Sequence, residues 1–462
     1  MNWKHGLLFA TIALGMFLDG LDGSIVNVAL PSIADDFGIS ASDTSWVITV
    51  YYLMMAGLIL IFGRLCDKGE IKRILLAGMA VFVLGSLLCG LSPSLTVLLV
   101  CRAIQGIGAA MLASSAVMLG VKFLPREKLG TAMSIVILGT SFGVALGPSL
   151  GAVLTHVASW HWIFFINVPI GIAAMAIAWK AVPEDSGLQP GDLDLKGSVL
   201  LFAAITLGLF AIERIPSSGI TTSSILALVG CLILFAVFVR YERGRPSPVL
   251  DLGLFRNRNF DLACLAYVFV NLGIMGVYYL VPFYLQNARG LSTLESGLVL
   301  SLQAISMIAC CLYVGRKSDK SGDRPFAIAA CVIMLVFMLV AYTFTSDTQV
   351  WTVAAAILVL GSVWGIGGGP MGARMIDSLS EEDKGSGSSM ITFTMYFSSA
   401  LGTAVFAGLF SLGTGTTASI SDVPTSVFMD GFAFCMVVAA AIAAIALLCT
   451  WAVKADRGGA DS

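Results

Sequence analysis

Charged residues are scarce in this chain of 462 residues: they make up 12% of it, whereas hydrophobic residues make up 58%. Soluble globular proteins carry about a quarter charged residues. The low charge, the mean hydropathy of +0.93 and the many long apolar runs exclude a soluble protein and predict a polytopic membrane protein. The net charge of −2 offers no basic surface, so no nucleic-acid partner is expected.

Histidine is also rare, with three residues, and none of the ten cysteines forms a CxxC pair. Nearly all the cysteines lie inside apolar runs, where we expect them to pack as small hydrophobic side chains. Structural zinc, a disulfide framework and a bound cofactor are therefore not expected. The sequence also lacks an HExxH zinc motif and a GxSxG nucleophile motif, which argues against an enzyme.

What the chain does have is fourteen apolar stretches that are long enough to cross a bilayer as helices. They are 7–31, 45–65, 74–92, 95–119, 131–155, 162–182, 197–215, 222–240, 260–283, 295–314, 326–345, 350–372, 389–412 and 428–452. They show little of the alternation that is typical of a β-barrel. The predicted fold is therefore an all-α membrane protein with fourteen transmembrane helices.

The positive charges predict how these helices are oriented. If the N-terminus is placed in the cytoplasm, 23 of the 26 Lys and Arg residues fall on the inner side. Arg214 and Arg289 fall on the outer side, and Arg102 lies within a span. Because cytoplasmic loops of membrane proteins are enriched in Lys and Arg, both termini are expected in the cytoplasm, with the chain in the cell membrane.

A short motif occurs twice in the inner loops. Residues 63–73 read GRLCDKGEIKR and residues 315–324 read GRKSDKSGDR, so that Gly63 and Asp67 correspond to Gly315 and Asp319. A glycine lets two helix ends approach closely, and an aspartate can accept hydrogen bonds from a helix N-terminus or pair with an arginine. An ordinary charged turn is the alternative interpretation of a single copy, but not of two copies at matching positions.

The spacing of the two copies predicts the domain organisation. Two six-helix repeats need an offset of only about 190 residues, and the surplus of about 60 residues fits one inserted helix pair. We therefore expect a 6 + 2 + 6 arrangement in a monomer. Its parts are an N-terminal bundle 1–182, an inserted pair 197–240, a C-terminal bundle 260–452 and a cytoplasmic tail 453–462.

These loops resemble the loop between helices 2 and 3 of the major facilitator superfamily, although Glu70 stands where a glycine is usual. LDGSIVNVALP (21–31), RAIQGIGAA (102–110) and GVALGPSLGA (143–152) resemble motifs of its fourteen-helix drug:proton antiporter branch. WHWIFFINVPIG (160–171) and PFYLQNARGLS (282–292) are also similar to that family. MYFSSALGTA (395–404) lacks the arginine and glutamine of the close drug exporters.

The resemblance implies a transporter that exchanges its substrate for protons, with roles for particular residues. It places Asp22 at the proton-coupling position, together with Arg102 and Gln105. It also implies that Pro148, flanked by Gly147 and Gly151, and the repeated loop residues control the conformational change. Those loop residues are Gly63, Asp67, Arg73, Gly315, Asp319 and Arg324.

Elementary electrostatics supports a special role for Asp19 and Asp22. A carboxylate in the middle of a bilayer costs about 2.5–3.5 kcal/mol on insertion scales, so it is rarely present without a function. Two carboxyl groups three residues apart lie on one helix face, where repulsion disfavours ionising both. One of them is therefore a predicted proton carrier. The resemblance points to Asp22, which leaves Asp19, outside the motif, as a second titrating site or a group that binds a cationic substrate. The alternative is that one of them caps a broken helix or binds Ser24 or Asn27.

Arg102 is the one basic residue placed inside a predicted span, and an unpaired guanidinium there is costly. It is expected to pair with a carboxylate or with backbone carbonyls, either to assist proton transfer or as a static structural pair. Aromatic side chains can bind lipophilic cations by cation–π contact, although many of them only anchor helices at the interface. The aromatic candidates for a substrate cavity are Tyr52, Phe142, Tyr279, Trp364 and Tyr396.

The sequence therefore predicts a proton-coupled exporter of amphipathic or cationic drugs. Its expected partners are a small-molecule substrate, protons and the lipid bilayer. Two alternatives stay open: export of an endogenous metabolite, lipid or siderophore by the same mechanism, and a receptor or scaffold that transports nothing.

Overall fold

The computed structural model describes residues 3–123, 129–185, 194–218, 221–243, 245, 248–379, 384–416 and 418–453, and every structural statement below concerns these residues. The helices of the first part are α1 (Trp3–Phe37), α2 (Ala41–Asp67), α3 (Ile71–Gly90), α4 (Leu95–Phe123), α5 (Leu129–Val157), α6 (Trp162–Phe165) and α7 (Asn167–Ala181). Two more, α8 (Leu195–Ser218) and α9 (Thr222–Glu242), follow. The last are α10 (Arg258–Phe283), α11 (Thr293–Ser321), α12 (Arg324–Tyr342), α13 (Val350–Asp377), α14 (Lys384–Thr414) and α15 (Thr425–Ala452).

Thirteen helices of the described chain are long and apolar enough to cross a membrane, and the apolar part of α8, Lys196–Ile212, is shorter. Every predicted stretch coincides with a helix, and the stretch 162–182 is formed by α6 and α7 together. The prediction of an all-helical membrane protein is therefore confirmed. Short 3₁₀ turns at Leu254–Arg256 and Ile420–Asp422 and a π turn at Tyr284–Ala288 lie between helices.

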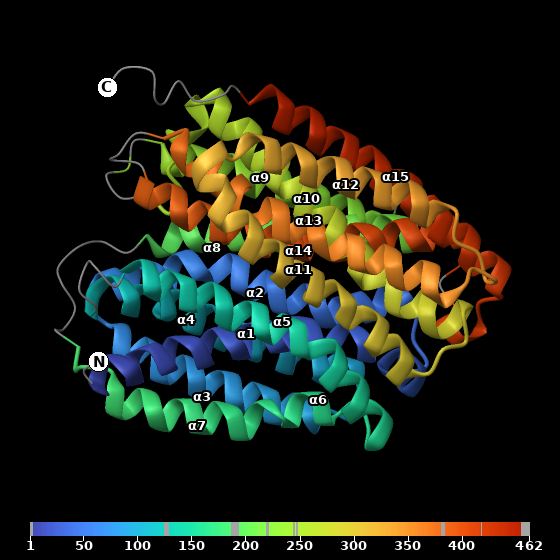
Figure 1. Ribbon diagram of the computed structural model, residues 1–462, viewed down its shortest axis with the longest axis horizontal. Helices are drawn as coiled ribbons and strands as arrows, with labels where there is room; N and C mark the ends of the chain where they lie inside the picture. The colour runs from blue at the N-terminus through green and yellow to red at the C-terminus, as the bar shows by residue number, and fades with distance from the viewer. Residues whose placement is uncertain are drawn as a thin grey trace.

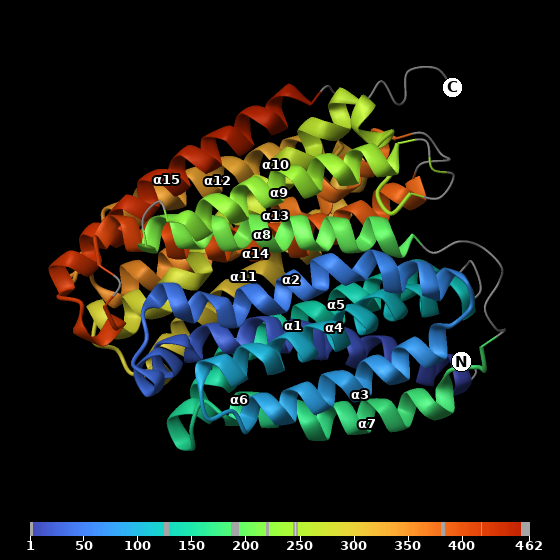
Figure 2. The same ribbon diagram turned by 180° about the vertical axis from the view of Figure 1, so that it is seen from behind.

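The helices form two bundles that lie side by side (Figures 1 and 2). Helices α1 to α7 make one bundle and α10 to α15 the other. The bundles meet where α2 packs against α14, where α5 packs against α11, and where α1 contacts α10. The beginning of α1 and the end of α15 lie at the same end of the molecule (Figure 1), which we call the terminal end.

Helices α8 and α9 lie along the boundary between the two bundles (Figure 2). α8 contacts α2 of the first bundle and α14 of the second, and α9 covers α8 from outside. Phe202 of α8 fits against Gly57 of α2, where a Cβ atom would overlap its ring. A small apolar cluster of Leu53, Leu209 and Ala400 joins α2, α8 and α14. The inserted pair therefore contacts both bundles at the place where they meet.

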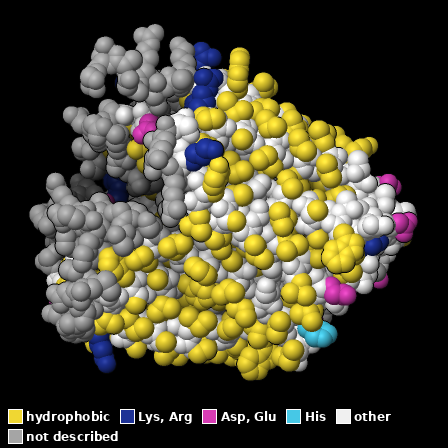
Figure 3. Space-filling view, in the orientation of Figure 1, with side chains coloured by type: hydrophobic (Ala, Val, Ile, Leu, Met, Phe, Trp, Pro, Cys, Tyr) yellow, Lys and Arg dark blue, Asp and Glu magenta, His cyan; other side chains and the backbone are white. Residues whose placement is uncertain are grey.

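Hydrophobic side chains are spread over the flank of the molecule, as expected of a surface that faces lipid (Figure 3). Large exposed apolar side chains of the described chain include Trp179, Leu232 and Trp351. In this view the Asp, Glu and His side chains that are visible lie mostly at the end opposite the terminal end.

Contacts between the bundles hold them together at the end opposite the terminal end. Gln286 Nε2 donates to Val28 O over 3.0 Å, and Ile420 N donates to Ile39 O over 3.4 Å. The Tyr279 hydroxyl donates to Ala41 O. Ser149 and Ser301 share a hydrogen bond between α5 and α11. In this conformation the bundles are therefore in close contact on that side.

The α1–α5 seam explains the glycine-rich segment around Pro148. Gly143, Gly147 and Gly151 recur every fourth residue, so they lie on one face of α5, which packs on the backbone of α1. A Cβ atom on Gly143 would lie 2.5 Å from Leu21 N, and one on Gly151 would lie 2.7 Å from Ile25 O. Small residues allow helix backbones to approach this closely in membranes. The segment therefore seals a seam inside the first bundle.

We expect Gly147→Ala to destabilise the protein, because the new Cβ would overlap Ser24 Oγ and lie 2.8 Å from Ile25 N. Overpacking of this kind costs about 1–3 kcal/mol. The thermal midpoint of the purified protein, measured by scanning fluorimetry, should fall. Gly369→Ala in α13 is the matched control, because no atom lies within 4 Å of the added Cβ. Equal midpoints for the two variants would contradict the seam.

Candidate functional site

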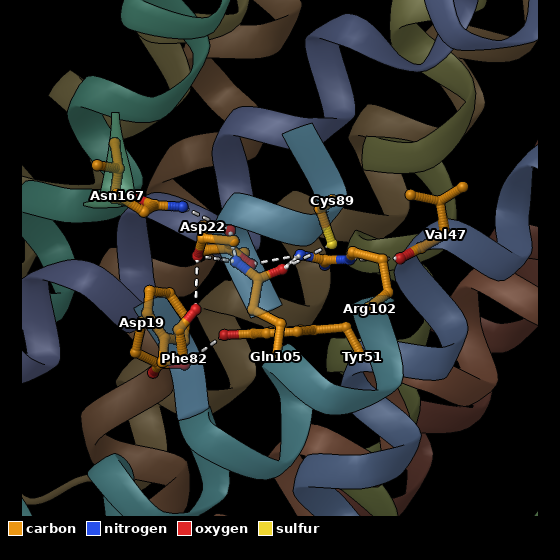
Figure 4. A network of polar contacts seen from close by, with 12 residues as sticks. Asp19, Asp22, Val47, Tyr51, Phe82, Cys89, Arg102, Gln105 and Asn167 are labelled. Carbon is orange, nitrogen blue, oxygen red and sulfur yellow. Dashed lines mark hydrogen bonds and ion pairs between the residues drawn. The ribbon is translucent and has the colours of Figure 1, made fainter. Parts of the chain in front are cut away.

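Asp22 lies at the centre of a buried polar network inside the first bundle (Figure 4). Its Oδ2 atom accepts from Arg102 Nη1 of α4 at 2.6 Å. Its Oδ1 atom accepts from Gln105 Nε2 at 2.7 Å and from Asn167 Nδ2 of α7 at 2.9 Å. The carboxylate therefore accepts hydrogen bonds from three side chains on two other helices, and one of these side chains, that of Arg102, is a cation.

Arg102 is equally well bound. Its Nε donates to Val47 O over 2.9 Å, and its Nη1 also donates to Gln105 Oε1 over 2.7 Å. The guanidinium carbon lies 4.2 Å from the centre of the Tyr51 ring, within range of a cation–π contact. Asp22 and Arg102 together carry no net charge. Both are fully buried, and removing either one would leave an uncompensated charge in the protein interior.

Asp19 lies one turn before Asp22 on α1, and its surroundings are different. Its Oδ1 accepts from the Tyr51 hydroxyl over 3.4 Å, and its Oδ2 accepts from the Tyr396 hydroxyl over 2.9 Å. The carboxyl is buried, and it takes part in none of the ion pairs found between described residues. Since Tyr396 belongs to α14, this carboxyl group connects the two bundles.

Tyr51 links the two acids, because its ring covers Arg102 and its hydroxyl reaches Asp19. Tyr52 continues the cluster: its ring centre lies 6.2 Å from that of Tyr396, in a stacked arrangement. In the second bundle, Trp364 and Tyr267 contact edge to face at 5.5 Å.

The other two aromatic candidates lie elsewhere. Tyr279 packs on Phe283 in α10 and contacts the start of α2. Phe142 on α5 leaves 54% of its surface exposed. Of the five aromatic candidates, Tyr52 and Tyr396 are the two whose contacts place them beside Asp19.

The first repeated loop joins α2 to α3 at the terminal end. Glu70 accepts from Arg73 Nη1 over 3.1 Å, so these two residues pair within the loop. The positive φ of 105° at Gly69 provides the turn that Gly322, with φ of 78°, provides in the second loop. Gly69 therefore allows Glu70 to replace the usual glycine.

The N-terminus of α3 is bound by a residue that the sequence did not indicate. Asp185, which follows α7, accepts from the backbone N–H groups of Lys72 and Arg73 over 2.8 and 3.0 Å. Glu184 pairs with the Lys72 side chain at 2.6 Å. The sequence left two roles open for Asp67, binding a helix N-terminus or pairing with an arginine, and its side chain is exposed at the end of α2. Asp185 is distant from α3 in sequence, but in the fold it lies next to the N-terminus of that helix.

The remaining conformational candidates lie at the same end. No described atom lies within 4 Å of a Cβ placed on Gly63, and its role in close contact between helix ends stays a prediction. Arg324 Nη2 donates to Trp451 O at the end of α15, over 3.1 Å. Gly315 and Asp319 lie in α11, but their side-chain positions fall outside the described part of the structure.

Sequence reasoning missed two contributors to the site, and the bridging role of a third residue, Tyr51, which the sequence shows only as one of several aromatic residues in the predicted spans. Asn167 and Ser86, whose hydroxyl lies 2.8 Å from Gln105 Nε2, both join the Asp22 network. Tyr51 bridges Arg102 and Asp19. Asn167 lies in the segment 160–171 that resembles the family, so a signal existed for it. For Ser86 no sequence signal distinguishes it from the other serines in apolar runs.

Comparison with known proteins agrees with this architecture. The family model described as Major Facilitator Superfamily matches residues 12–403. The riboflavin transporter RibZ of Clostridioides difficile (strain 630) is 30% identical over 406 residues, which cover 88% of each chain. The putative multidrug resistance protein MdtD of Citrobacter koseri is 30% identical over 440 residues, covering 94% of this chain and 92% of MdtD.

A solved structure has the same fold. It is the bacterial homologue of the human lysosomal transporter Spinster in an inward-facing, unoccupied conformation, with a TM-score of 0.69 and 14% identity over 98% of both chains. With the matched family model, the helical architecture and the multi-pass character, the conclusion is direct: this chain is a transporter, not an enzyme, and it belongs to the Major Facilitator Superfamily.

Proposed function

We propose that this protein is a proton-coupled antiporter that exports amphipathic or cationic small molecules across the cytoplasmic membrane. The observation that carries the proposal is the pair of acids on α1. Asp22 is bound to Arg102, whereas Asp19 is buried without an ion-pair partner and connects the two bundles through Tyr396. The multidrug-resistance relatives support the substrate class.

The proposed topology has six, two and six helices, with both termini in the cytoplasm. In this assignment α1 to α7 form the N-terminal bundle (1–182), with α6 and α7 as one span. Helices α8 and α9 form the inserted pair (197–240), and α10 to α15 form the C-terminal bundle (260–452). The excess of Lys and Arg in the loops on one side supports this orientation.

The contacts of the two acids suggest that the proton is exchanged at Asp19 and not at Asp22, the aspartate that the motif indicates. Protonating Asp22 would leave Arg102 buried without an anionic partner, which costs several kcal/mol. Protonating Asp19 would instead remove a buried charge that no cation compensates. We therefore propose that Asp19 exchanges protons with the solution, and that Asp22, Arg102 and Gln105 form the neutral framework that positions it.

Exchange follows if Asp19 holds either a proton or a cationic substrate, but not both. Tyr396 donates to Asp19 from the other bundle, so this hydrogen bond must break or move when the bundles rock against one another. An entering proton gains about 2.3 kcal/mol per 100 mV of membrane potential, and about 1.4 kcal/mol per pH unit. Exchange of one proton for a monovalent cation moves no net charge, so the pH gradient alone drives it and supports about a tenfold substrate gradient per pH unit. A second proton per cycle adds the contribution of the membrane potential.

A second candidate function is export of an endogenous planar metabolite by the same mechanism. The riboflavin transporter relative favours it, as do the stacked rings of Tyr52 and Tyr396 beside Asp19. A flat ring system could stack on these tyrosines without a positive charge. The two candidate functions differ in the charge of the substrate: the first requires a cation, and the second a planar molecule that need not be charged.

Asp19→Asn should abolish uphill export while leaving the fold intact, because the amide keeps hydrogen bonds with Tyr51 and Tyr396 but cannot exchange a proton. We expect at least a tenfold lower substrate gradient, equivalent to about 1.4 kcal/mol. The measurement is efflux of a cationic dye from proteoliposomes under an imposed pH gradient. Full uphill pumping by this variant would rule out Asp19 as the coupling group.

Asp22→Asn should act mainly on stability. It leaves Arg102 buried beside a neutral amide, and breaking such a buried pair costs about 3–5 kcal/mol. The double variant Asp22→Asn/Arg102→Gln removes both charges and should recover much of the thermal midpoint. If Asp22→Asn instead folds normally and loses only coupling, the motif aspartate is the proton carrier.

A substrate panel separates the remaining alternatives. In proteoliposomes with an imposed pH gradient we expect a lipophilic cation to be transported and to drive proton movement. Riboflavin should move at least about tenfold more slowly, because Asp19 favours positive charge. Transport of riboflavin but not of cations would identify the metabolite exporter. Absence of substrate-driven proton movement across the panel would instead favour a receptor.

A further inference from the structure

Two buried acids that the transport mechanism does not use lie at the base of the inserted helix pair. Asp194 immediately precedes α8 and Glu242 ends α9, so the helical hairpin brings them together at the terminal end (Figure 2). Asp194 leaves 4% of its surface exposed and Glu242 leaves 3%. Burial of two carboxyl groups so close together is costly unless each oxygen finds a partner.

One oxygen of Asp194 is fully bound. Its Oδ1 atom accepts from Gly197 N at 2.9 Å and from the Tyr241 hydroxyl at 3.1 Å, and Arg245 Nη1 lies 3.5 Å away. Asp194 is thus the N-terminal cap of α8, a position where the helix dipole stabilises negative charge. Its second oxygen, Oδ2, is buried and has no donor among the described residues.

Glu242 shows the same asymmetry. Its Oε2 atom accepts from the Val249 backbone N–H at 3.0 Å, whereas its Oε1 atom is buried without a donor in the described structure. The two unpartnered oxygens both face Gly197: a Cβ there would lie 2.7 Å from Asp194 Oδ2 and would overlap Glu242 Oε1. Because both oxygens lie against the same point on Gly197, the two carboxyl groups face each other at the base of the hairpin.

Two ionised carboxylates placed this close would repel each other with no donor between them, whereas one proton would let one carboxyl group donate to the other. The helix dipole indicates where the proton is held. Glu242 lies at the C-terminus of α9, where negative charge is unfavourable, whereas Asp194 caps an N-terminus. The proton therefore belongs on Glu242 Oε1 and is donated to Asp194 Oδ2.

We propose that Asp194 and Glu242 form a proton-binding site that closes the base of the inserted pair. With the proton bound, Glu242 connects the beginning of α8, the end of α9 and the segment around Val249 that leads to α10. Without it, two buried carboxylates repel each other, and the contact between Glu242 and the Val249 segment loosens.

The neighbouring charges do not supply a substitute for the proton. Arg245 lies on the Oδ1 side of Asp194, and its guanidinium carbon stacks 4.2 Å from the centre of the Tyr241 ring. Arg64, at the end of α2, is a further positive charge that acts on Glu242. Lys196 and Arg243, the adjacent cations on α8 and after α9, are exposed.

The position of this site gives it a mechanical consequence. α8 packs against α2 and α14, the helices at which the two bundles meet, and the Val249 segment leads into α10. Loosening the base of the pair therefore affects contacts of both bundles. The inference concerns residues outside the Asp19 site, and it holds whether or not export is coupled to protons.

The test measures hydrogen exchange of residues 248–256 by mass spectrometry, for the full-length protein in lipid nanodiscs between pH 5.5 and 8.5, after correction for the intrinsic pH dependence of exchange. Because the closed pair binds a proton that separated carboxyl groups release at neutral pH, raising the pH should increase exchange in the wild type. Glu242→Gln should remain protected throughout, because its amide donates to Asp194 Oδ2 without titrating. Glu242→Ala should be unprotected throughout.

Asp347→Asn, which changes an exposed carboxyl group at the other end of the molecule, is the matched control and should behave as the wild type. Infrared spectroscopy provides a second measurement, since the C=O stretch of a protonated carboxyl present in the wild type should be lost in Glu242→Gln. Wild-type exchange that does not depend on pH, or a pH dependence that persists in Glu242→Gln, would overturn the proposal. Protection that requires Mg²⁺ or Ca²⁺ and is lost with a chelator would also overturn it, because the bound ion would then be a metal.

Discussion

The buried pair of Asp22 and Arg102 is the interaction on which the rest of the first bundle depends. Both charges are fully buried, so they depend on neighbouring polar groups for their hydrogen bonds. Gln105, Asn167 and the carbonyl of Val47 supply these contacts from α4, α7 and α2. The pair thereby fixes how four helices pack, and it holds α1 in one register against them.

This arrangement also explains why two acids one turn apart behave differently. The network around Asp22 pairs its carboxylate with a cation and two amides, and Asp19 lies at its edge with two tyrosine hydroxyls and no ion pair among the described residues. One of those tyrosines comes from the second bundle. A change of charge at Asp19 therefore alters contacts in both bundles, whereas a change of charge at Asp22 would disrupt packing within the N-terminal bundle.

The inserted pair repeats this principle at the terminal end of the molecule. Asp194 and Glu242 each have one buried oxygen without a donor among the described residues, at the base of helices that contact both bundles. Asp19 and this pair of acids thus lie where helices of different bundles meet or where connecting segments join them. At such places, the binding or release of a proton changes contacts between helices that can move relative to one another.

Much of this protein followed from its sequence alone. The helices and their order could be predicted because backbone hydrogen bonds must be satisfied within each span, which leaves long apolar runs as an unambiguous signal. The repeated loops and the aspartates of α1 were visible for the same reason, since charge is rare in such runs. Only the tertiary structure decided which acid is paired, because Asp19 and Asp22 look alike in sequence while Arg102, Asn167 and Tyr396 reach them from distant helices. It also decided that Asp185 rather than Asp67 binds the start of α3, because hydrogen bonds act over a few ångströms in space whatever the separation along the chain.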